Sequence, residues 1–136
     1  MFDGLRHLPL FDPDLELNEP LAVVETWRRA LAGADGVLIA SPEYGFSLPG
    51  ALKNGIDWVI GTGELERKIV AVTASTNHPE RGRRGLKALC DTLNAVSAII
   101  VGGEPTVRGA SFESSVYALV VELAAAVARE NEVPTH

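Results

Sequence analysis

Gly36-Val-Leu-Ile-Ala40, followed at once by Ser41-Pro-Glu-Tyr-Gly-Phe-Ser-Leu-Pro-Gly-Ala-Leu-Lys-Asn-Gly-Ile-Asp-Trp58, is the stretch that decides the fold. The first five residues form an uncharged apolar run, which is typical of a strand buried in a parallel sheet. Pro42 and Gly45 then end the strand, and the apolar spacing after Pro49 indicates a helix. A strand that turns directly into a helix is the repeating unit of α/β proteins.

The same alternation of patterns continues along the rest of the chain. It predicts strands at 35–40, 67–74 and 97–101, and helices at 18–32, 49–60, 85–95 and 112–130. Asn18 looks like the N-cap of the first helix, and Gly102-Gly103 looks like the end of the third strand. Pro9 and Pro13 argue against a long helix or strand in the first segment, which we expect to pack as an extended chain.

Strands that alternate with helices imply a parallel sheet covered by helices on both faces, because right-handed crossovers place them there. Ligands of such sheets bind beyond the carboxyl ends of the strands. Three loops should meet at that edge, at 41–48, 75–84 and 102–111, and they are rich in Gly, Ser, Thr, Pro and Asn. The sequence therefore predicts a ligand site there.

The first of these loops has residues suited to a flat, anionic ligand. Gly45 lets a ligand approach the backbone closely, while Tyr44 and Phe46 offer aromatic surface for a ring system. Ser47 is placed to cap the following helix and to donate to an anion or a ring oxygen. The same residue types also build ordinary strand-to-helix turns, so residue types alone leave both interpretations open.

The loop and its helix resemble the NADPH-dependent FMN reductase family, whose matching stretch reads Pro-Glu-Tyr-Asn-x-Ser-x-Pro-Gly-x-Leu-Lys-Asn-Ala-Ile-Asp-Trp. This sequence departs from it with Gly45 in place of Asn and Gly55 in place of Ala. The chain matches it at Pro42, Glu43, Tyr44, Ser47, Pro49, Gly50, Leu52, Lys53, Asn54, Ile56, Asp57 and Trp58.

The resemblance implies which residues hold a cofactor. In that family the loop wraps the isoalloxazine ring of FMN, largely through backbone groups, and a second loop touches the ring and ribityl chain. The implied FMN-binding residues are Pro42, Glu43, Tyr44, Gly45, Phe46 and Ser47 in the first loop, and Ser75, Gly82 and Gly85 in the second. Arg83 or Arg84 could meet a phosphate of NADPH, or simply lie in solvent. No catalytic side chain and no metal ligand is expected.

The fold that the resemblance implies is flavodoxin-like, a three-layer α/β sandwich with a five-stranded parallel sheet ordered 2-1-3-4-5. The family's first strand ends in a Gly-Ser-x-Arg-x-x-Ser loop for the FMN phosphate, and no such motif occurs here. We therefore expect one flavodoxin-like domain over 1–136, truncated at its N-terminus. Three alternatives follow. The chain is a fragment or has a mis-set start; or its open sheet edge is covered by residues 1–14 or by another subunit; or it has lost FMN phosphate binding and has a different role.

The expected function is that of an FMN-dependent NAD(P)H oxidoreductase that reduces a flavin, a quinone or a similar acceptor. The alternative is a non-enzymatic, cofactor-free subunit or remnant that acts through subunit association. A formal charge of −6 argues against nucleic acid, and no apolar run reaches membrane-spanning length. The lone Cys90 fits the cytoplasm, and its place in the predicted helix at 85–95 fits an inert thiol. The last helix is apolar nearly all round, which predicts burial or a homo-oligomer interface.

Overall fold

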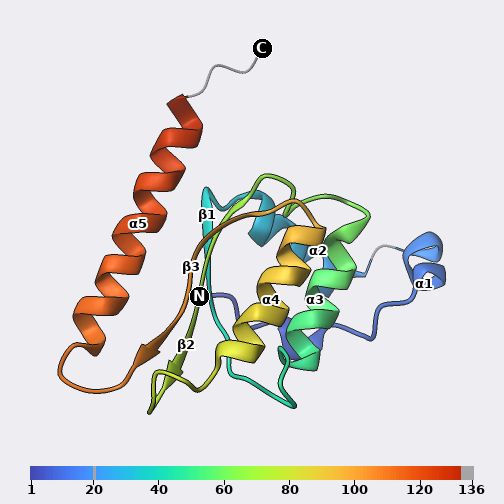
Figure 1. Cartoon of the computed structure of the whole chain (residues 1–136). Coiled ribbons are helices and arrows are strands. Elements are labelled where there is room, and N and C mark those ends of the chain that lie inside the picture. The colour runs from blue at the N-terminus through green and yellow to red at the C-terminus, as the bar shows by residue number, and fades with distance from the viewer. Residues whose placement is uncertain (20, 133–136) are drawn as a thin grey trace.

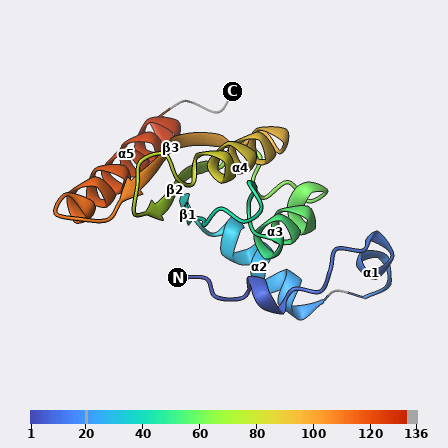
Figure 2. The same cartoon turned by 60° about the horizontal axis from the view of Figure 1, so that its bottom comes forward.

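The sheet is parallel and has three strands in the order β1-β2-β3. The computed structural model describes residues 1–19 and 21–132. The strands are β1 (Gly36–Ala40), β2 (Ile69–Thr76) and β3 (Ile99–Val107), and the long helices are α2 (Ala22–Ala32), α3 (Gly50–Ile60), α4 (Arg83–Ala95) and α5 (Phe112–Glu132). Helices α2, α3 and α4 cover one face and α5 lies on the other (Figures 1 and 2). The predicted three-layer α/β class is confirmed, with three strands in the described sheet.

The core lies between β2 and the three-helix face. Val70 and Val72 of β2 are fully buried, and they belong to one apolar cluster with Leu86, Leu89 and Leu93 of α4. These three leucines recur at helical spacing, so they lie on a single side of α4. The face of α4 predicted from the sequence is therefore confirmed, and so is the burial of Leu52 and Ile56 in α3.

Helix α5 lies alone on its face of the sheet. Within the described part of this helix only Ala126 is buried, whereas Tyr117 is 72% exposed, Val121 48% and Val120 43%. One helix can turn only one side to a sheet. The apolar residues on the opposite side of α5 therefore remain exposed in the described chain. The prediction that this helix is buried on several sides within the chain is therefore wrong, while the interface interpretation stays open.

The first segment is more regular than predicted. It contains a short 3₁₀ turn, Leu5–His7, and a short helix, α1 (Pro13–Asn18). Asp12 caps α1 by accepting a hydrogen bond from the Asp14 N–H at 2.9 Å, and Pro13 holds the first helical position. Asn18 ends α1 instead of starting α2, because its side-chain amide donates to the Asp14 carbonyl. The N-cap prediction for Asn18 is wrong, and α2 begins after Leu21.

The first segment packs against α2 and α3. The carbonyl of Pro9 accepts hydrogen bonds from the side chains of Asn54 and Trp58, each at 2.8 Å, and the ring of Phe2 lies 4.6 Å from that of Trp27. None of these contacts involves β1, which pairs only with β2 among the described residues. Residues 1–14 therefore add no strand beside β1 in the described chain, and the alternatives for covering the open edge stay open.

The ends of β2 and β3 differ from the prediction. Strand β3 passes through Gly102 and Gly103 and continues to Val107, with a β-bulge opposite Val72 and Ala74. The two glycines have φ of 75° and 99°, a left-handed backbone that glycine adopts without strain. They carry the strand through the bulge instead of ending it. As a result both strands extend further toward the predicted ligand edge. Among the described residues, no helix combines the length and apolarity needed to cross a bilayer.

Candidate functional site

A cleft of about 390 Å³ opens at the carboxyl ends of β1 and β2, where the sequence predicts a ligand site. Its volume lies within the range typical of small-molecule sites. Residues from all three predicted loops contribute to it. Its lining consists of Pro42, Glu43, Ala74, Ser75, Thr76, Asn77, Arg81, Gly82 and Arg108.

The first loop is a tight two-residue hairpin. The Tyr44 N–H donates to the Ser47 carbonyl at 2.9 Å, and the Ser47 N–H donates back to the Tyr44 carbonyl at 3.0 Å. Gly45 and Phe46, the two residues between them, have φ of 55° and 62°, as in a type I′ turn. Asn and Gly are the residues that adopt this backbone most readily. Gly45 therefore lies in a backbone conformation that the Asn of the resembling motif can also adopt.

The hairpin tip carries the two aromatic side chains outward. Tyr44 is 64% exposed and Phe46 is 66% exposed. The guanidinium carbon of Arg84 lies 4.2 Å from the centre of the Phe46 ring, a cation–π contact that joins the tip to α4. Ser47 does not cap α3, because the N-cap position belongs to Pro49 and has no side-chain hydrogen bond. The capping prediction for Ser47 is wrong, since the hairpin holds this residue two positions before the cap.

Glu43 fastens the hairpin to the N-terminus of α4. Its Oε2 accepts a hydrogen bond from the Gly85 N–H at 2.9 Å. A Cβ at Gly85 would lie 2.9 Å from Glu43 Cβ and 3.0 Å from the Ser47 carbonyl oxygen, so only glycine permits this approach. A carboxylate at a helix N-terminus is also favoured by the helix dipole. Gly85 therefore positions the first loop instead of lining the cleft.

Ser75 and Arg108 join the ends of β2 and β3 inside the cleft. The Arg108 Nε donates to the Ser75 hydroxyl at 2.9 Å, and the Arg108 backbone N–H donates to the Thr76 carbonyl at 2.8 Å. The sequence interpretation missed Arg108, because its position depends on the register of β3 beyond the bulge, which no local pattern shows. Thr76 was missed for the related reason that β2 runs two residues beyond its predicted end.

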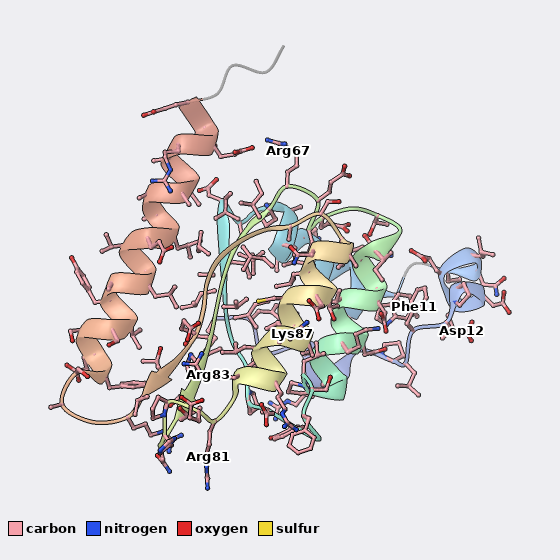
Figure 3. The ribbon with its side chains drawn as sticks, viewed as in Figure 1. Phe11, Asp12, Arg67, Arg81, Arg83 and Lys87 are labelled. Atoms are coloured by element: carbon pink, nitrogen blue, oxygen red, sulfur yellow. The ribbon has the colours of Figure 1, made fainter. Side chains whose placement is uncertain are left out.

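The arginines proposed from the sequence for a phosphate lie elsewhere. Arg83 pairs with Glu104 at 2.6 Å and with Glu80 at 3.7 Å, so its charge is already neutralised. Arg84 lies over Phe46, as described above. Arg81, from the same basic run, lines the cleft instead and projects from the lower end of the molecule (Figure 3).

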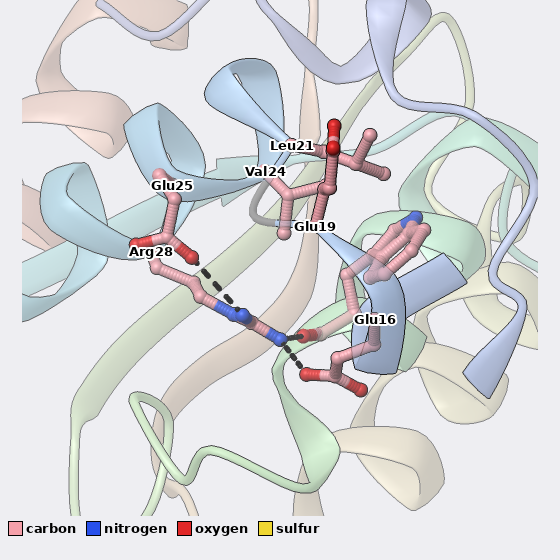
Figure 4. A pocket seen from close by; sticks show the side chains of 7 residues that line it. Glu16, Glu19, Leu21, Val24, Glu25 and Arg28 are labelled. Carbon is pink, nitrogen blue, oxygen red and sulfur yellow. Dashed lines mark hydrogen bonds and ion pairs between the residues drawn. The ribbon is translucent and has the colours of Figure 1, made fainter. Parts of the chain in front are cut away.

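A second hollow, of about 230 Å³, lies between α1, α2 and α3 (Figure 4). Its centre is Arg28, whose guanidinium donates to Glu16, to Glu25 and to the Trp58 carbonyl. The Arg28 side chain is only 14% exposed, and its ion pairs raise its pKa although burial opposes this. We interpret this cluster as a structural clamp, because both terminal nitrogens of its arginine bond to protein groups. The buried Nε of Arg28 makes no hydrogen bond in the described chain and lies 4.0 Å from Glu64.

The predicted site residues therefore fall into three groups. Pro42, Glu43, Ser75 and Gly82 line the cleft together. Tyr44, Gly45, Phe46 and Ser47 form the hairpin beside it, and Gly85 locks that hairpin to α4.

The family model described as NADPH-dependent FMN reductase matches residues 1–111, which include the hairpin and all lining residues of the cleft. The chain belongs to the NADPH-dependent FMN reductase family. The resemblance drawn from the hairpin sequence is thereby confirmed.

Relatives with named activities match about two fifths of the chain. It is 47% identical over 57 residues to the quinone reductase of Escherichia coli K12, covering 41% of this chain and 30% of that protein. It is 50% identical over 52 residues to the NADPH:quinone oxidoreductase of Arabidopsis thaliana, covering 38% and 26%. A 2-hydroxy-1,4-benzoquinone reductase of a Burkholderia species is 45% identical over 57 residues, covering 42% and 31%. The matches thus span under a third of each relative's length.

Solved structures share the fold over most of the chain. FerB, a flavoenzyme NAD(P)H:(acceptor) oxidoreductase from Paracoccus denitrificans, superposes with a TM-score of 0.70 at 24% identity, covering 90% of this chain and 75% of that one. An oxidoreductase from Corynebacterium diphtheriae gives 0.67 at 22% identity, covering 86% and 70%. The predicted flavodoxin-like fold class is confirmed.

Proposed function

We propose that this chain binds FMN at the hairpin and cleft, and that it serves as an NAD(P)H oxidoreductase that reduces quinones, free flavins or similar acceptors. The observation that carries the proposal is the hairpin Tyr44–Ser47, whose sequence resembles the family's flavin loop and whose backbone lies beside a ligand-sized cleft. The quinone reductase names of its relatives support the choice of acceptor.

The residues at the cleft fit a flavin. The hairpin offers two aromatic side chains and a glycine, Gly45, over which a Cβ would meet nothing within 4 Å, so a flat ring has access to the backbone. Glycine at such a position allows close approach of a ligand. Pro42, Glu43, Ser75 and Gly82 would form the wall beside the ring.

These contacts indicate what the cofactor and the protein would each contribute. FMN, when bound, supplies the hydride and electron chemistry, and the protein supplies binding and orientation. Glu43 and Gly85 hold the hairpin against α4, and Ser75 holds Arg108 at the cleft. We assign no side chain as an acid or base, since hydride and electron transfer by the flavin requires no such side chain from the protein. NADPH would approach the same edge of the sheet, which lies at the carboxyl ends of the strands.

Residues 1–136 are proposed to form a single flavodoxin-like domain that associates with a second copy. The exposed apolar residues Tyr117, Val120 and Val121 of α5 support association, because large exposed apolar patches usually mark interfaces. The lone Cys90 supports the cytoplasmic location expected from the sequence. Light scattering should give twice the chain mass for the wild type, and a reduced mass for Val121→Glu.

The test of the proposed activity measures FMN binding and turnover in one preparation. The purified chain should quench FMN fluorescence on titration and, when loaded, should oxidise NADPH in the presence of benzoquinone. Binding without turnover would reject the reductase activity and keep the flavin site. Neither binding nor turnover would favour the alternative, a cofactor-free subunit that acts through association.

A further inference from the structure

The cleft is cationic although the chain is acidic. The formal net charge of the protein is −6, yet the charged residues that line the cleft are Arg81, Arg108 and one carboxylate, Glu43. That carboxylate is held at the N-terminus of α4 by the Gly85 N–H, where the positive end of the helix dipole offsets part of its charge. The two guanidinium groups therefore dominate the electrostatics of the cleft.

These two arginines differ from the nearby Arg83 in being unpaired. Arg83 is neutralised by Glu104 and Glu80. Within residues 1–19 and 21–132, no carboxylate lies within ion-pair distance of Arg81 or Arg108. An exposed arginine without a partner keeps its full charge available for a ligand.

Arg108 is also held in place. Its backbone N–H donates to the Thr76 carbonyl at 2.8 Å, and its Nε donates to the Ser75 hydroxyl at 2.9 Å. Both the backbone of Arg108 and the Nε of its guanidinium group are therefore fixed to the end of β2. The two terminal nitrogens of Arg108 make no hydrogen bond in the described chain. A planar fork with two free nitrogens matches two oxygens of a phosphate.

We propose that Arg108, held by Ser75 and assisted by Arg81, forms an anion subsite of the cleft that binds a phosphate group of a nucleotide ligand. This inference rests on the proposed function, which supplies the two nucleotides concerned, a flavin mononucleotide and a nicotinamide dinucleotide. Both carry phosphate, and the guanidinium fork recognises the phosphate chemistry that they share. Arg108 is in this account a binding residue, and Ser75 is the residue that positions it.

The test compares ligands with and without phosphate on matched variants. The dissociation constants of FMN, riboflavin, NADP⁺ and NAD⁺ are measured for the wild type, Arg108→Gln, Arg81→Gln and Ser75→Ala. The control is Arg29→Gln, which removes the same charge from the exposed side of α2, where Arg29 makes only a 3.5 Å hydrogen bond to Thr26. Arg108→Gln should weaken one class of phosphate-bearing ligand about tenfold, as expected for loss of a charge-assisted hydrogen bond.

The four ligands distinguish the source of the phosphate. If it belongs to the flavin, FMN weakens and riboflavin does not. If it belongs to the nicotinamide nucleotide, NADP⁺ weakens, with or without NAD⁺, and both flavins keep their affinity. Ser75→Ala should give a smaller loss of the same kind, and it should have no further effect in the Arg108→Gln background.

The proposal is overturned if no nucleotide weakens by more than twofold in Arg108→Gln, or if riboflavin weakens as much as FMN. It is also overturned if Arg29→Gln has the same effect as Arg108→Gln. A wild-type chain that binds flavin while its variants are unaffected rejects the anion subsite alone. A wild-type chain that binds neither flavin nor NADP⁺ rejects the subsite and the proposed function together.

Discussion

At the scale of single residues, the site depends on glycines that are required for different reasons. Gly45 provides a left-handed backbone in the hairpin, and Gly85 provides room for that hairpin against α4. The sequence comparison marks Gly45 as a departure from the family's Asn. In the structure Gly45 has a φ of 55°, a left-handed backbone that Asn also adopts.

Gly85→Ala should destabilise the hairpin and weaken flavin binding. The added Cβ would lie 3.0 Å from Glu43 Cα and from the Ser47 carbonyl oxygen, so backbone atoms must move. We expect a loss of about 1–3 kcal/mol in the free energy of unfolding, as for overpacked sites. Chemical denaturation measures it. The matched control is Gly61→Ala, where a Cβ meets nothing within 4 Å, and an equal loss in both variants would contradict the account.

Cys90 should be a slow nucleophile. Burial raises the pKa of its thiol, and the neighbouring Asp91 raises it further. A raised pKa keeps the thiol protonated at pH values where an exposed cysteine is partly thiolate, and the thiolate is the reactive form. The rate of alkylation by iodoacetamide in the folded protein should therefore stay well below that of free cysteine at pH 8 and rise only at higher pH. A rate equal to that of free cysteine at pH 8 would contradict this.

At the scale of elements, the sequence predicted the faces of helices better than the ends of strands. The helical spacing of three leucines predicts the buried side of α4, and these residues, Leu86, Leu89 and Leu93, are indeed buried. The end of β3 could not be predicted, because a Gly-Gly pair that usually stops a strand here carries it past a bulge. Arg108 was missed for that reason, since its place at the cleft is set by pairing between strands.

The docking of α1 depends on one arginine. Arg28 bridges Glu16 of α1, Glu25 of α2 and the Trp58 carbonyl of α3, so its removal leaves acidic groups close together without a cation. Arg28→Ala should lower the free energy of unfolding by about 2–3 kcal/mol. The neighbouring exposed Arg29 provides the control, and Arg29→Ala should change stability by no more than about 0.5 kcal/mol. Thermal unfolding of the two variants measures the difference, and similar losses would show that Arg28 is no clamp.

At the scale of the whole molecule, the three-stranded sheet has two exposed surfaces of different character. The carboxyl edge carries the cleft, the hairpin and the unpaired arginines. The side with α5 and the unpaired edge of β1 carries exposed apolar residues, among them Leu38, which is 42% exposed. Composition and strand–helix alternation were sufficient to predict the layered fold. They could not predict that α5 would lie alone, because this depends on how many strands and helices share its face.

The most direct test of the central claim is an FMN titration of the wild type, Gly45→Asn and Gly45→Val, followed by fluorescence quenching. If the hairpin is the flavin loop, the wild type should bind FMN and Gly45→Asn should bind it within about twofold, because Asn tolerates the left-handed backbone. Gly45→Val should bind it about tenfold more weakly, since a β-branched residue strains this conformation by about 1–2 kcal/mol. No FMN binding by the wild type, or equal binding by Gly45→Asn and Gly45→Val, would contradict the account.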